Sequence, residues 1–388
     1  MPSDPIPDLS LRRWPDVEAD NLFATDSADR LILDEVAGVL ADADPARSDA
    51  DGIVVIGDNY GALTLGAIER FGATAVRVHQ DRLVGEQALD ANAADLGLSG
   101  YQHHGLDPAL VIGARVILLR LPRSLDALDE IAGLIARHSA PGVTVFGGGR
   151  IKHLTTAMNE VLLRHFGRLD ISHARQKARV LVAAEPLTTA ASATAGTGTT
   201  FPQRQFHPDL DLWVCAHGGA FASTRVDIGT RFLLSVTDQM MPDAASAIDL
   251  GSGTGVLAAM LAKQRPTLRI IATDQSSAAV ASTRATAVAN GVDDRITVVR
   301  DSGLASQPDG SADLILLNPP FHVESTVHLG EALRLFEESG RVLRPGGELW
   351  TVFNSHLGYR STLSRVVGPT RQVARNAKFM VMVSTRPA

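Results

Sequence analysis

The chain has 388 residues, 45% of them hydrophobic and 20% charged, and its formal net charge is −7 at pH 7. This composition predicts a soluble globular protein of two ordinary domains and argues against a molecule coated in positive charge. No stretch approaches twenty consecutive apolar residues, and the first residues lack a secretory signal, so we expect a cytoplasmic protein without a membrane segment. The only cysteine, Cys215, excludes an internal disulfide and a multi-cysteine zinc site, and no metal is expected.

Both halves of the chain alternate apolar, strand-like runs with helical stretches rich in Ala and Leu. This alternation is typical of an α/β fold in which helices cover both faces of a parallel sheet. In the first half, residues 52–63 are similar in sequence to residues 247–257 of the second half. We infer a duplicated fold, and chance similarity between two strand-turn-helix units is the alternative.

The first copy lacks the residues that would hold a ligand in the second copy. Asn59 stands where the second half has Gly253, and only His79 or Gln80 is available where the next strand of the second half ends in Asp274. Residues 119–122 read Leu-Arg-Leu-Pro, without an amide side chain. We therefore expect a degenerate first domain that has lost a cofactor and kept a structural or substrate-binding role.

Small and polar residues fill positions 187–200, which follow neither helical nor strand periodicity. This composition predicts a flexible linker. We divide the chain into a first domain over residues 1–185, a linker over 186–205 and a second domain over 206–388.

Lysine and arginine gather in two segments, and either could contact phosphates. A solvated basic face, balanced elsewhere, is the alternative for each. One segment contains only Glu160 and Asp170 as acids, and its cations are Arg150, Lys152, Arg164, Arg168, Arg175, Lys177 and Arg179. Residues 349–388 contain no acid, and their cations are Arg360, Arg365, Arg371, Arg375, Lys378 and Arg386.

A glycine-rich segment, residues 249–255, follows the short apolar run 247–248 and precedes a helical stretch that begins at Val256. Glycines at such a turn let the backbone pass close to a bound nucleoside, so the segment predicts a cofactor cradle. The dinucleotide pattern of dehydrogenases fails here, because its third glycine would fall at Val256.

Two aspartates end the next apolar runs. Asp274 follows residues 270–272 at the distance where a carboxylate can accept from both hydroxyls of a ribose. Asp301 ends the run 296–300 and could accept from an adenine amine. Each aspartate alone could cap a turn or helix, but the ordered set fits S-adenosylmethionine better than a nicotinamide cofactor.

The tetrapeptide Asn318-Pro319-Pro320-Phe321 ends the apolar run 314–317, at the edge of a parallel sheet where ligands bind. The Asn318 side-chain oxygen and the Pro319 carbonyl can each accept a hydrogen bond from a planar amine and orient its lone pair toward a methyl donor. Phe321 would stack on a flipped target base. A proline turn that caps a buried strand is the alternative. His322 would contact the base or a phosphate, or lie in solvent at a helix start.

These motifs resemble the ribosomal RNA guanine-N2 methyltransferases, and more closely the large-subunit enzyme than the small-subunit one. The resemblance rests on residues 226–232, 249–255 and 318–322, and in the first half on residues 121–125 and 147–150. It implies two tandem, Rossmann-like methyltransferase domains with seven-stranded, mostly parallel sheets, the first degenerate and recognising RNA. It also implies catalytic roles for Asn318, Pro319, Pro320, Phe321 and His322, and S-adenosylmethionine binding by Phe221, Asp227, Gly229, Asp249, Gly251, Ser252, Gly253, Gly255, Asp274, Gln275, Asp301, Ser302 and Asn318.

The expected substrate is therefore a guanine in ribosomal RNA, free or within a ribosomal subunit or assembly intermediate, and the expected enzyme is a monomer. Adenine-N6 or protein-glutamine methylation is the nearest alternative, since both use a planar amine, and small-subunit RNA is a further one. A non-catalytic RNA-binding protein would need the second domain to have lost its cofactor, which the intact glycines and Asp274 argue against.

Overall fold

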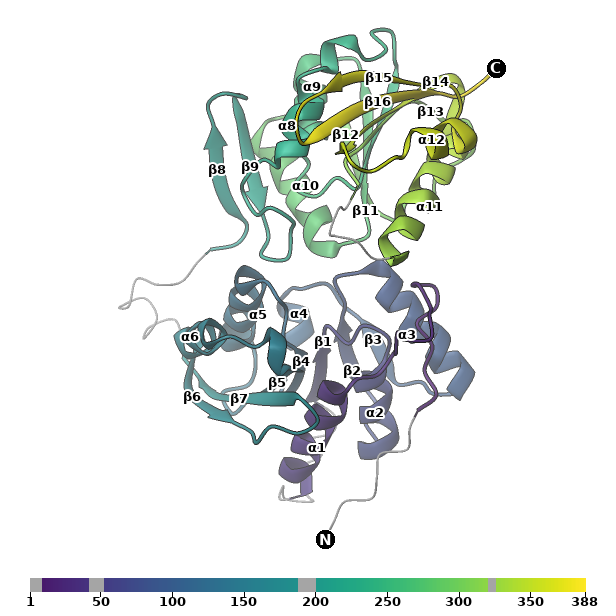
Figure 1. The fold of residues 1–388 in the computed structure, drawn as a ribbon. Coiled ribbons are helices and arrows are strands. Elements are labelled where there is room, and N and C mark those ends of the chain that lie inside the picture. The colour runs from purple at the N-terminus through teal and green to yellow at the C-terminus, as the bar shows by residue number, and fades with distance from the viewer. Residues whose placement is uncertain (1–8, 42–51, 188–199, 320–325) are drawn as a thin grey trace. The chain divides into compact units, whose positions relative to one another are not determined.

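The computed structural model of the chain describes residues 9–41, 52–187, 200–319 and 326–388 (Figure 1). The chain divides into two compact units, Met1–Phe201 and Pro202–Ala388, each with its own central sheet. Strand β7 (Ala178–Pro186) is the last strand of the first unit in sequence, and strand β8 (Gln203–His207) is the first strand of the second unit. Most of the segment predicted as a linker, residues 188–199, lies outside the described residues.

The described part of the first unit forms a seven-stranded sheet in the order β3-β2-β1-β4-β5-β7-β6. Only β7 runs antiparallel to its neighbours. The other strands are β1 (Ile53–Ile56), β2 (Val76–His79), β3 (Tyr101–His103), β4 (Val116–Arg120), β5 (Thr144–Arg150) and β6 (Phe166–Ile171). The helices are α1 (Ser27–Ala41), α2 (Ala62–Phe71), α3 (Leu83–Leu96), α4 (Pro108–Val111), α5 (Leu125–His138), α6 (Thr156–His165) and the 3-10 helix η2 (Ile151–His153).

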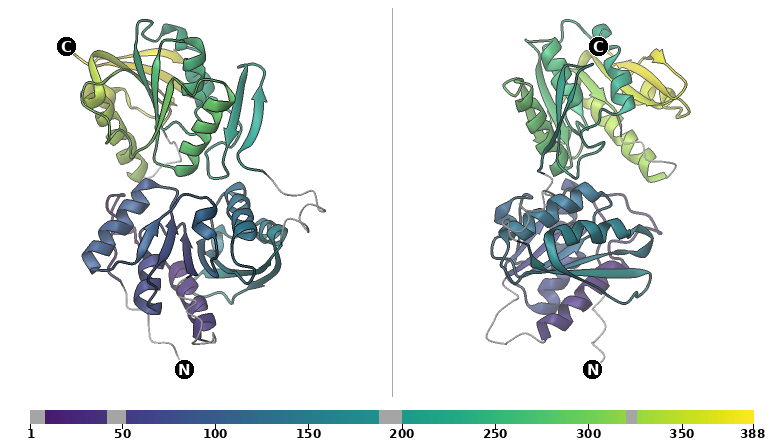
Figure 2. Two further views of the ribbon diagram at one scale, coloured as in Figure 1. Left: turned by 180° about the vertical axis from the view of Figure 1, so that it is seen from behind. Right: turned by 90° about the vertical axis from the view of Figure 1, so that its left-hand side faces the viewer.

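Helices cover both faces of this sheet (Figure 2). Ile53 and Val55 of β1 pack with α1, α2 and α3, whereas Val54 and Ile56 pack with α4, α5 and α6. Because successive side chains of a strand point to opposite faces, a strand covered on both sides is apolar throughout. This explains the continuous apolar runs that the sequence shows.

The described part of the second unit forms a seven-stranded sheet in the order β12-β11-β10-β13-β14-β16-β15, in which only β16 is antiparallel to its neighbours. A separate hairpin joins β8 to β9 (Leu212–Ala216). The sheet's strands are β10 (Ser246–Leu250), β11 (Arg269–Asp274), β12 (Ile296–Arg300), β13 (Ala312–Leu317), β14 (Leu343–Asn354), β15 (Thr370–Arg375) and β16 (Phe379–Thr385). The helices are α8 (Ile228–Leu234), α9 (Val256–Gln264), α10 (Ser277–Ala289), α11 (Thr326–Val342), α12 (Arg360–Val366) and the 3-10 helix η3 (Thr237–Gln239).

The core of the second unit also has two layers, one on each face of its sheet. Leu314 and Leu316 of β13 pack with α8, α9 and α10, and Ile315 and Leu317 pack with α11 and α12. Every residue of β13 is buried, so the strand brings the residue that follows it, Asn318, to a fixed place at the carboxyl edge of the sheet.

The two units share more than strand order. After the central strand of each sheet, three alternate positions have positive φ: 77°, 62° and 100° at Gly57, Asn59 and Gly61, and 72°, 55° and 76° at Gly251, Gly253 and Gly255. This agreement in order and turn conformation confirms the predicted α/β fold of two tandem methyltransferase-like domains. It also rules out a likeness confined to one strand-turn-helix unit.

Candidate active site

The glycine turn after β10 is held by hydrogen bonds to the neighbouring strand. The backbone N–H groups of Gly251 and Ser252 both donate to the Thr273 carbonyl, at 2.9 and 3.0 Å. An added Cβ at Gly251 or Gly253 would meet nothing within 4 Å. Positive φ favours glycine at both positions, and the space beside them is open to a ligand. The turn therefore fits the cradle that the sequence predicts.

Gly255 has a different role, because it lies against helix α10. Its Cβ would come 2.8 Å from Thr283 Cγ2 and 3.0 Å from Thr283 Cα. Ser252 and Thr283 join their hydroxyls at 3.0 Å, which fixes the turn to the helix. Gly255 thus allows close packing of the turn on α10, whereas Gly251 and Gly253 border open space.

Asp249 precedes the cradle in β10 and is 1% exposed. Its Oδ2 accepts from the Ala258 backbone N–H at 3.0 Å, while its Oδ1 is buried without a partner among the described residues. Burial raises the pKa of Asp249 to about 7, and the nearby Asp274 adds to the rise. Burial therefore favours the protonated form of this carboxyl group.

Asp274 stands at the end of β11, as predicted. Its two oxygens accept from the backbone N–H groups of Gly253, at 3.0 Å, and Ser276, at 2.9 Å. The next residue, Gln275, donates from Nε2 to Glu331 at 3.4 Å, and its Oε1 is buried with no partner in the described part of the chain. Asp274 therefore borders the glycine turn directly.

Asp301 lies at the end of the neighbouring strand, and its backbone N–H donates to the Asp274 carbonyl at 3.0 Å. Its Oδ2 accepts from both the backbone and the hydroxyl of Ser306, at 2.9 and 2.7 Å. This oxygen therefore caps a turn, which is the alternative considered for it. The Ser302 carbonyl accepts from Arg334 at 2.9 Å, which fixes the following loop to α11.

Asn318 follows β13 and contacts the start of helix α8. Its Nδ2 donates to Asp227 Oδ2 and to Thr230 Oγ1, both at 3.0 Å. Asp227 is also the N-cap of α8 and accepts from the backbone N–H groups of Gly229 and Thr230. Both amide hydrogens of Asn318 are thus used within the protein, and its Oδ1 is the atom available to a substrate.

Pro319 and Phe221 are the last two predicted residues that the structure describes. Pro319 is buried next to Asn318, and Phe221 is 56% exposed in the turn region before α8. Pro320, Phe321 and His322 lie outside the described residues. Thr230 was not predicted. Its spacing from Asp227, in the first turn of a helix, is the sequence signal that could have indicated it.

In the first unit, an arginine occupies the place of Asn318. Arg120 and Asn318 each follow the residue that pairs with the last residue of the central strand. The Arg120 guanidinium pairs with Asp26, at 2.9 Å, and with the buried Asp29. Burial raises the pKa of Asp29 to about 6. This ion cluster replaces the amide and its acceptor, so the first unit lacks the pair that the second unit presents.

Gln80 is the counterpart of Asp274. The Gly57 N–H donates to the His79 carbonyl as the Gly251 N–H donates to the Thr273 carbonyl, and Gln80 and Asp274 each follow that carbonyl by one residue. The Gln80 Nε2 donates to the Gly85 carbonyl at 2.9 Å. The choice between His79 and Gln80 is thereby resolved, and a neutral amide replaces the carboxylate.

Known protein families match both units of the chain. Residues 211–383 match the family described as "Methyltransferase small domain", and residues 3–187 match the one described as "RLMG N-terminal domain". A protein of Streptomyces coelicolor named "Ribosomal RNA large subunit methyltransferase G" is 34% identical over 97% of this chain and 97% of its own. The chain belongs to this family. A relative of the same name from Ectopseudomonas mendocina is 32% identical over 98% of both chains.

Among solved structures, the chain is similar to a Thermus thermophilus 16S rRNA N2 G1207 methyltransferase in complex with AdoMet and guanosine. The TM-score is 0.71 at 18% identity, over 93% of this chain and 92% of the other. This likeness confirms the two-unit fold. Across the described residues of this family member, no helix is long and apolar enough to cross a membrane, and no three His, Cys, Asp or Glu residues are grouped to hold a metal ion.

Proposed function

We propose that the chain is an S-adenosylmethionine-dependent enzyme that methylates the exocyclic N2 amine of a guanine in large-subunit ribosomal RNA. The observation that carries this proposal is the Asn318 amide, whose nitrogen is engaged by Asp227 and Thr230 and whose oxygen is left for a substrate amine. Family membership over nearly the whole chain supports the RNA substrate.

An aromatic amine is a poor nucleophile because its lone pair is delocalised into the ring. Asn318 Oδ1 and the Pro319 carbonyl accept one hydrogen bond each from the two amine hydrogens and aim the lone pair. Proline fixes the backbone at this point, so the acceptors are oriented before the substrate arrives. S-adenosylmethionine supplies an electrophilic methyl group on a sulfonium. Phe321 stacks on the flipped base in this proposal.

In this proposal, S-adenosylmethionine binds at the glycine turn and at the ends of the neighbouring strands. Gly251, Ser252, Gly253 and Gly255 form the turn beside the open space, and Asp274 accepts from the ribose hydroxyls. Asp301 and Ser302 border the adenine, and Gln275 Oε1 is an unused acceptor beside them. Asp249, in the strand that precedes the turn, supports the cradle through its bond to the Ala258 N–H.

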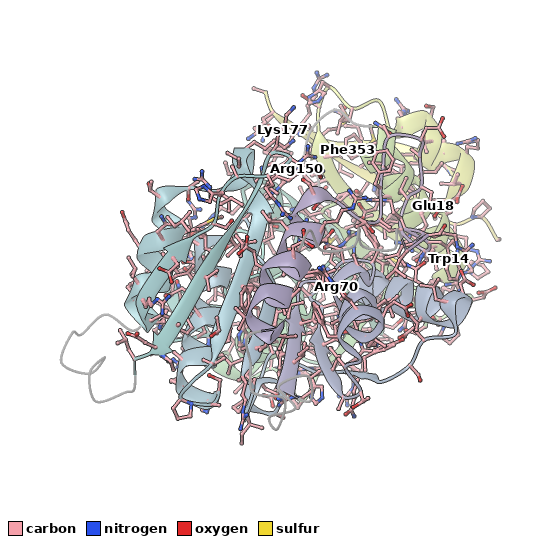
Figure 3. All side chains as sticks on the ribbon, turned by 90° about the horizontal axis from the view of Figure 1, so that it is seen from below. Trp14, Glu18, Arg70, Arg150, Lys177 and Phe353 are labelled. Carbon is pink, nitrogen blue, oxygen red and sulfur yellow. The ribbon has the colours of Figure 1, made fainter. Side chains whose placement is uncertain are left out.

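The first unit contributes RNA recognition in this proposal. Its basic run divides into paired and unpaired cations. Arg164, Arg168 and Arg175 pair with Asp129, Asp170 and Asp34, respectively. Arg150 and Lys177 are exposed, form no ion pair among the described residues and lie close together, where β5 and β7 meet (Figure 3). Unpaired, exposed cations can bind phosphates without first breaking an ion pair.

The enzyme acts as a cytoplasmic monomer without a metal, on free RNA or on a ribosomal subunit or assembly intermediate. These points are predictions from the sequence. Sedimentation with and without ribosomal RNA tests the oligomeric state, and activity on RNA against whole subunits tests the substrate form.

Labelled S-adenosylmethionine, incubated with unmodified ribosomal RNA of both subunits, tests the reaction. The RNA is digested to nucleosides and the methylated product is identified by mass. N2-methylguanosine in large-subunit RNA is the expected result. N2-methylguanosine in small-subunit RNA alone would correct the substrate, whereas N6-methyladenosine or labelled protein would contradict the guanine chemistry.

A further inference from the structure

We infer that Asp227, Gly229 and Thr230 position the Asn318 amide, so that its oxygen rather than its nitrogen faces the substrate amine. The resemblance assigns Asp227 and Gly229 to the cofactor. The geometry gives all three residues a positioning role in the reaction proposed above, on which this inference rests.

The two acceptors leave the amide one orientation. An ionised carboxylate can only accept hydrogen bonds, so Asp227 Oδ2 must face Nδ2, at 3.0 Å. Thr230 Oγ1, also at 3.0 Å, takes the second amide hydrogen. A rotated amide would bring its oxygen against the carboxylate and would present N–H groups to the substrate's own N–H groups. The rotated form could not accept from the amine.

Gly229 leaves room for this arrangement. A Cβ at this position would lie 2.9 Å from Asp227 Oδ2 and 3.1 Å from Asn318 Oδ1. Backbone conformation does not require glycine here, because Gly229 lies in the first turn of α8 and its φ is not positive. The atoms in the way are ends of side chains rather than backbone. Alanine would therefore move the Asp227 carboxylate and the Asn318 amide while α8 stays folded.

The substitution Gly229→Ala tests the role, with Gly38→Ala as its matched control. Gly38 lies in α1, and a Cβ there meets nothing within 4 Å. Alanine improves helix propensity at both sites, which offsets part of the cost of moving the Asp227 cap in Gly229→Ala, so both variants should stay folded at the assay temperature. We expect Gly229→Ala to lower kcat on the order of 100-fold with an unchanged dissociation constant for S-adenosylmethionine, and Gly38→Ala to leave both at the wild-type value. Weaker cofactor binding at unchanged kcat would overturn the inference and restore the cofactor role.

The substitution Thr230→Val tests the second acceptor without disturbing the cap of α8. It keeps the shape of the side chain and removes the oxygen, and kcat should fall about 2- to 10-fold. Thr230→Ser, which keeps an oxygen, should recover much of this loss. Equal kcat for the valine variant and the wild type would remove Thr230 from the positioning set.

A measurement without turnover separates this inference from the proposed reaction. In protein with ¹⁵N-labelled asparagine, the Asn318 side-chain signal is identified by its loss in Asn318→Ala. Exchange of its Nδ2 hydrogens with solvent should be slow in the wild type and faster in Thr230→Val. Fast exchange in the wild type would overturn the positioning role even in an active enzyme. If exchange is slow and no N2-methylguanosine forms, the amide is held as inferred but the proposed reaction fails.

Discussion

Asn318 is the residue on which the proposed chemistry depends most directly. Asn318→Ala removes an acceptor aimed at the substrate amine, while Asp227 keeps its bonds to the backbone of α8. We expect kcat to fall by about 10²-fold or more, with cofactor affinity unchanged. Single-turnover methylation and calorimetric titration with S-adenosylmethionine measure the two effects. Unchanged turnover would rule out the proposed role of the amide.

Because the pKa of Asp249 is raised, we expect the stability of the second unit to depend on pH. Its folded pKa, about 7, is above the ordinary value of 3.8 for an exposed aspartate. Between these values the folded state keeps a proton that the unfolded state has lost, so this group makes the protein less stable as the pH rises from 3.8 to 7, and the loss of stability persists above 7.

Asparagine resembles the protonated carboxyl and cannot ionise. Asp249→Asn should therefore stabilise the second unit at about pH 8 relative to the wild type, by a few kcal/mol at most. At about pH 4 the difference should be small. Calorimetric melting of both proteins at the two pH values measures this, and an equal difference under both conditions would show that Asp249 ionises normally.

The sequence predicted the positions of some site residues correctly and left others unresolved. Asp274 and Asn318 were placed correctly at strand ends, because a continuous apolar run shows closely where a buried strand ends. His79 and Gln80 could not be distinguished, since one residue of register decides between them. The spacing of Thr230 from Asp227 indicates a helix start, but the contact of Thr230 with Asn318 joins residues 88 apart in sequence, and no local pattern encodes that contact.

At the scale of an element, the turn after the central strand can be compared between the two units. Asn59 adopts φ 62° at the place of Gly253, whose φ is 55°. An asparagine is therefore compatible with this turn, and the backbone conformation alone does not require glycine at 253. Asparagine tolerates this left-handed conformation better than most residues do.

Gly253→Asn should accordingly fold with nearly wild-type stability and lose S-adenosylmethionine binding, because its side chain enters the open space of the cradle. Gly255→Ala is the contrasting variant. Its Cβ would collide with Thr283, so it should lower the melting temperature of the second unit. Thermal melting and calorimetric titration of both proteins test the contrast. Tight cofactor binding by Gly253→Asn would show that the ligand does not approach this turn.

The fold was largely predictable because its elements follow local sequence patterns. Continuous apolar strands, glycine turns and helical stretches rich in Ala and Leu are local patterns, and they predicted the α/β class and the site's edge of the sheet. The hairpin of β8 and β9 was not predicted. It packs along α10 through bonds such as that from the Cys215 N–H to Thr286 Oγ1, and only the folded chain brings these segments together.

For the whole molecule, the two units differ in what occupies the same place. Arg120→Met in the first unit would leave Asp26 and the buried Asp29 without their cation. Removing one partner of a buried ion pair costs about 3–5 kcal/mol, so the first unit should melt at a lower temperature. Cofactor binding by the second unit should be unchanged.

Adding Asp29→Asn to this variant should restore part of the stability, because one of the two unpaired carboxylates is removed. Calorimetry that resolves the two units tests both variants. A wild-type melting curve for Arg120→Met would show that the ion cluster does not stabilise the first unit.

Sheet topology places two basic residues of the second unit at the same edge of the sheet as Asn318. β14 is parallel to β13, and its last residue, Asn354, pairs with Phe379, the first residue of the antiparallel β16. The turn between β15 and β16 therefore lies at the same edge as Asn318. Arg375 and Lys378 are exposed in and beside this turn, with no ion pair among the described residues.

RNA phosphates flanking the target nucleotide would meet this turn. We expect Arg375→Glu with Lys378→Glu to weaken RNA binding and to reduce the slope of log K against log salt by about 0.7 for each phosphate that the turn no longer neutralises. Arg269→Glu, a single charge reversal, is the control for position, since Arg269 is exposed at the start of β11, at the opposite edge of the sheet. Filter binding of large-subunit RNA over a range of salt concentrations measures both slopes. The same slope for the double variant and the wild type would mean that the turn does not bind phosphates, and the RNA path would then have to leave the active site on another side.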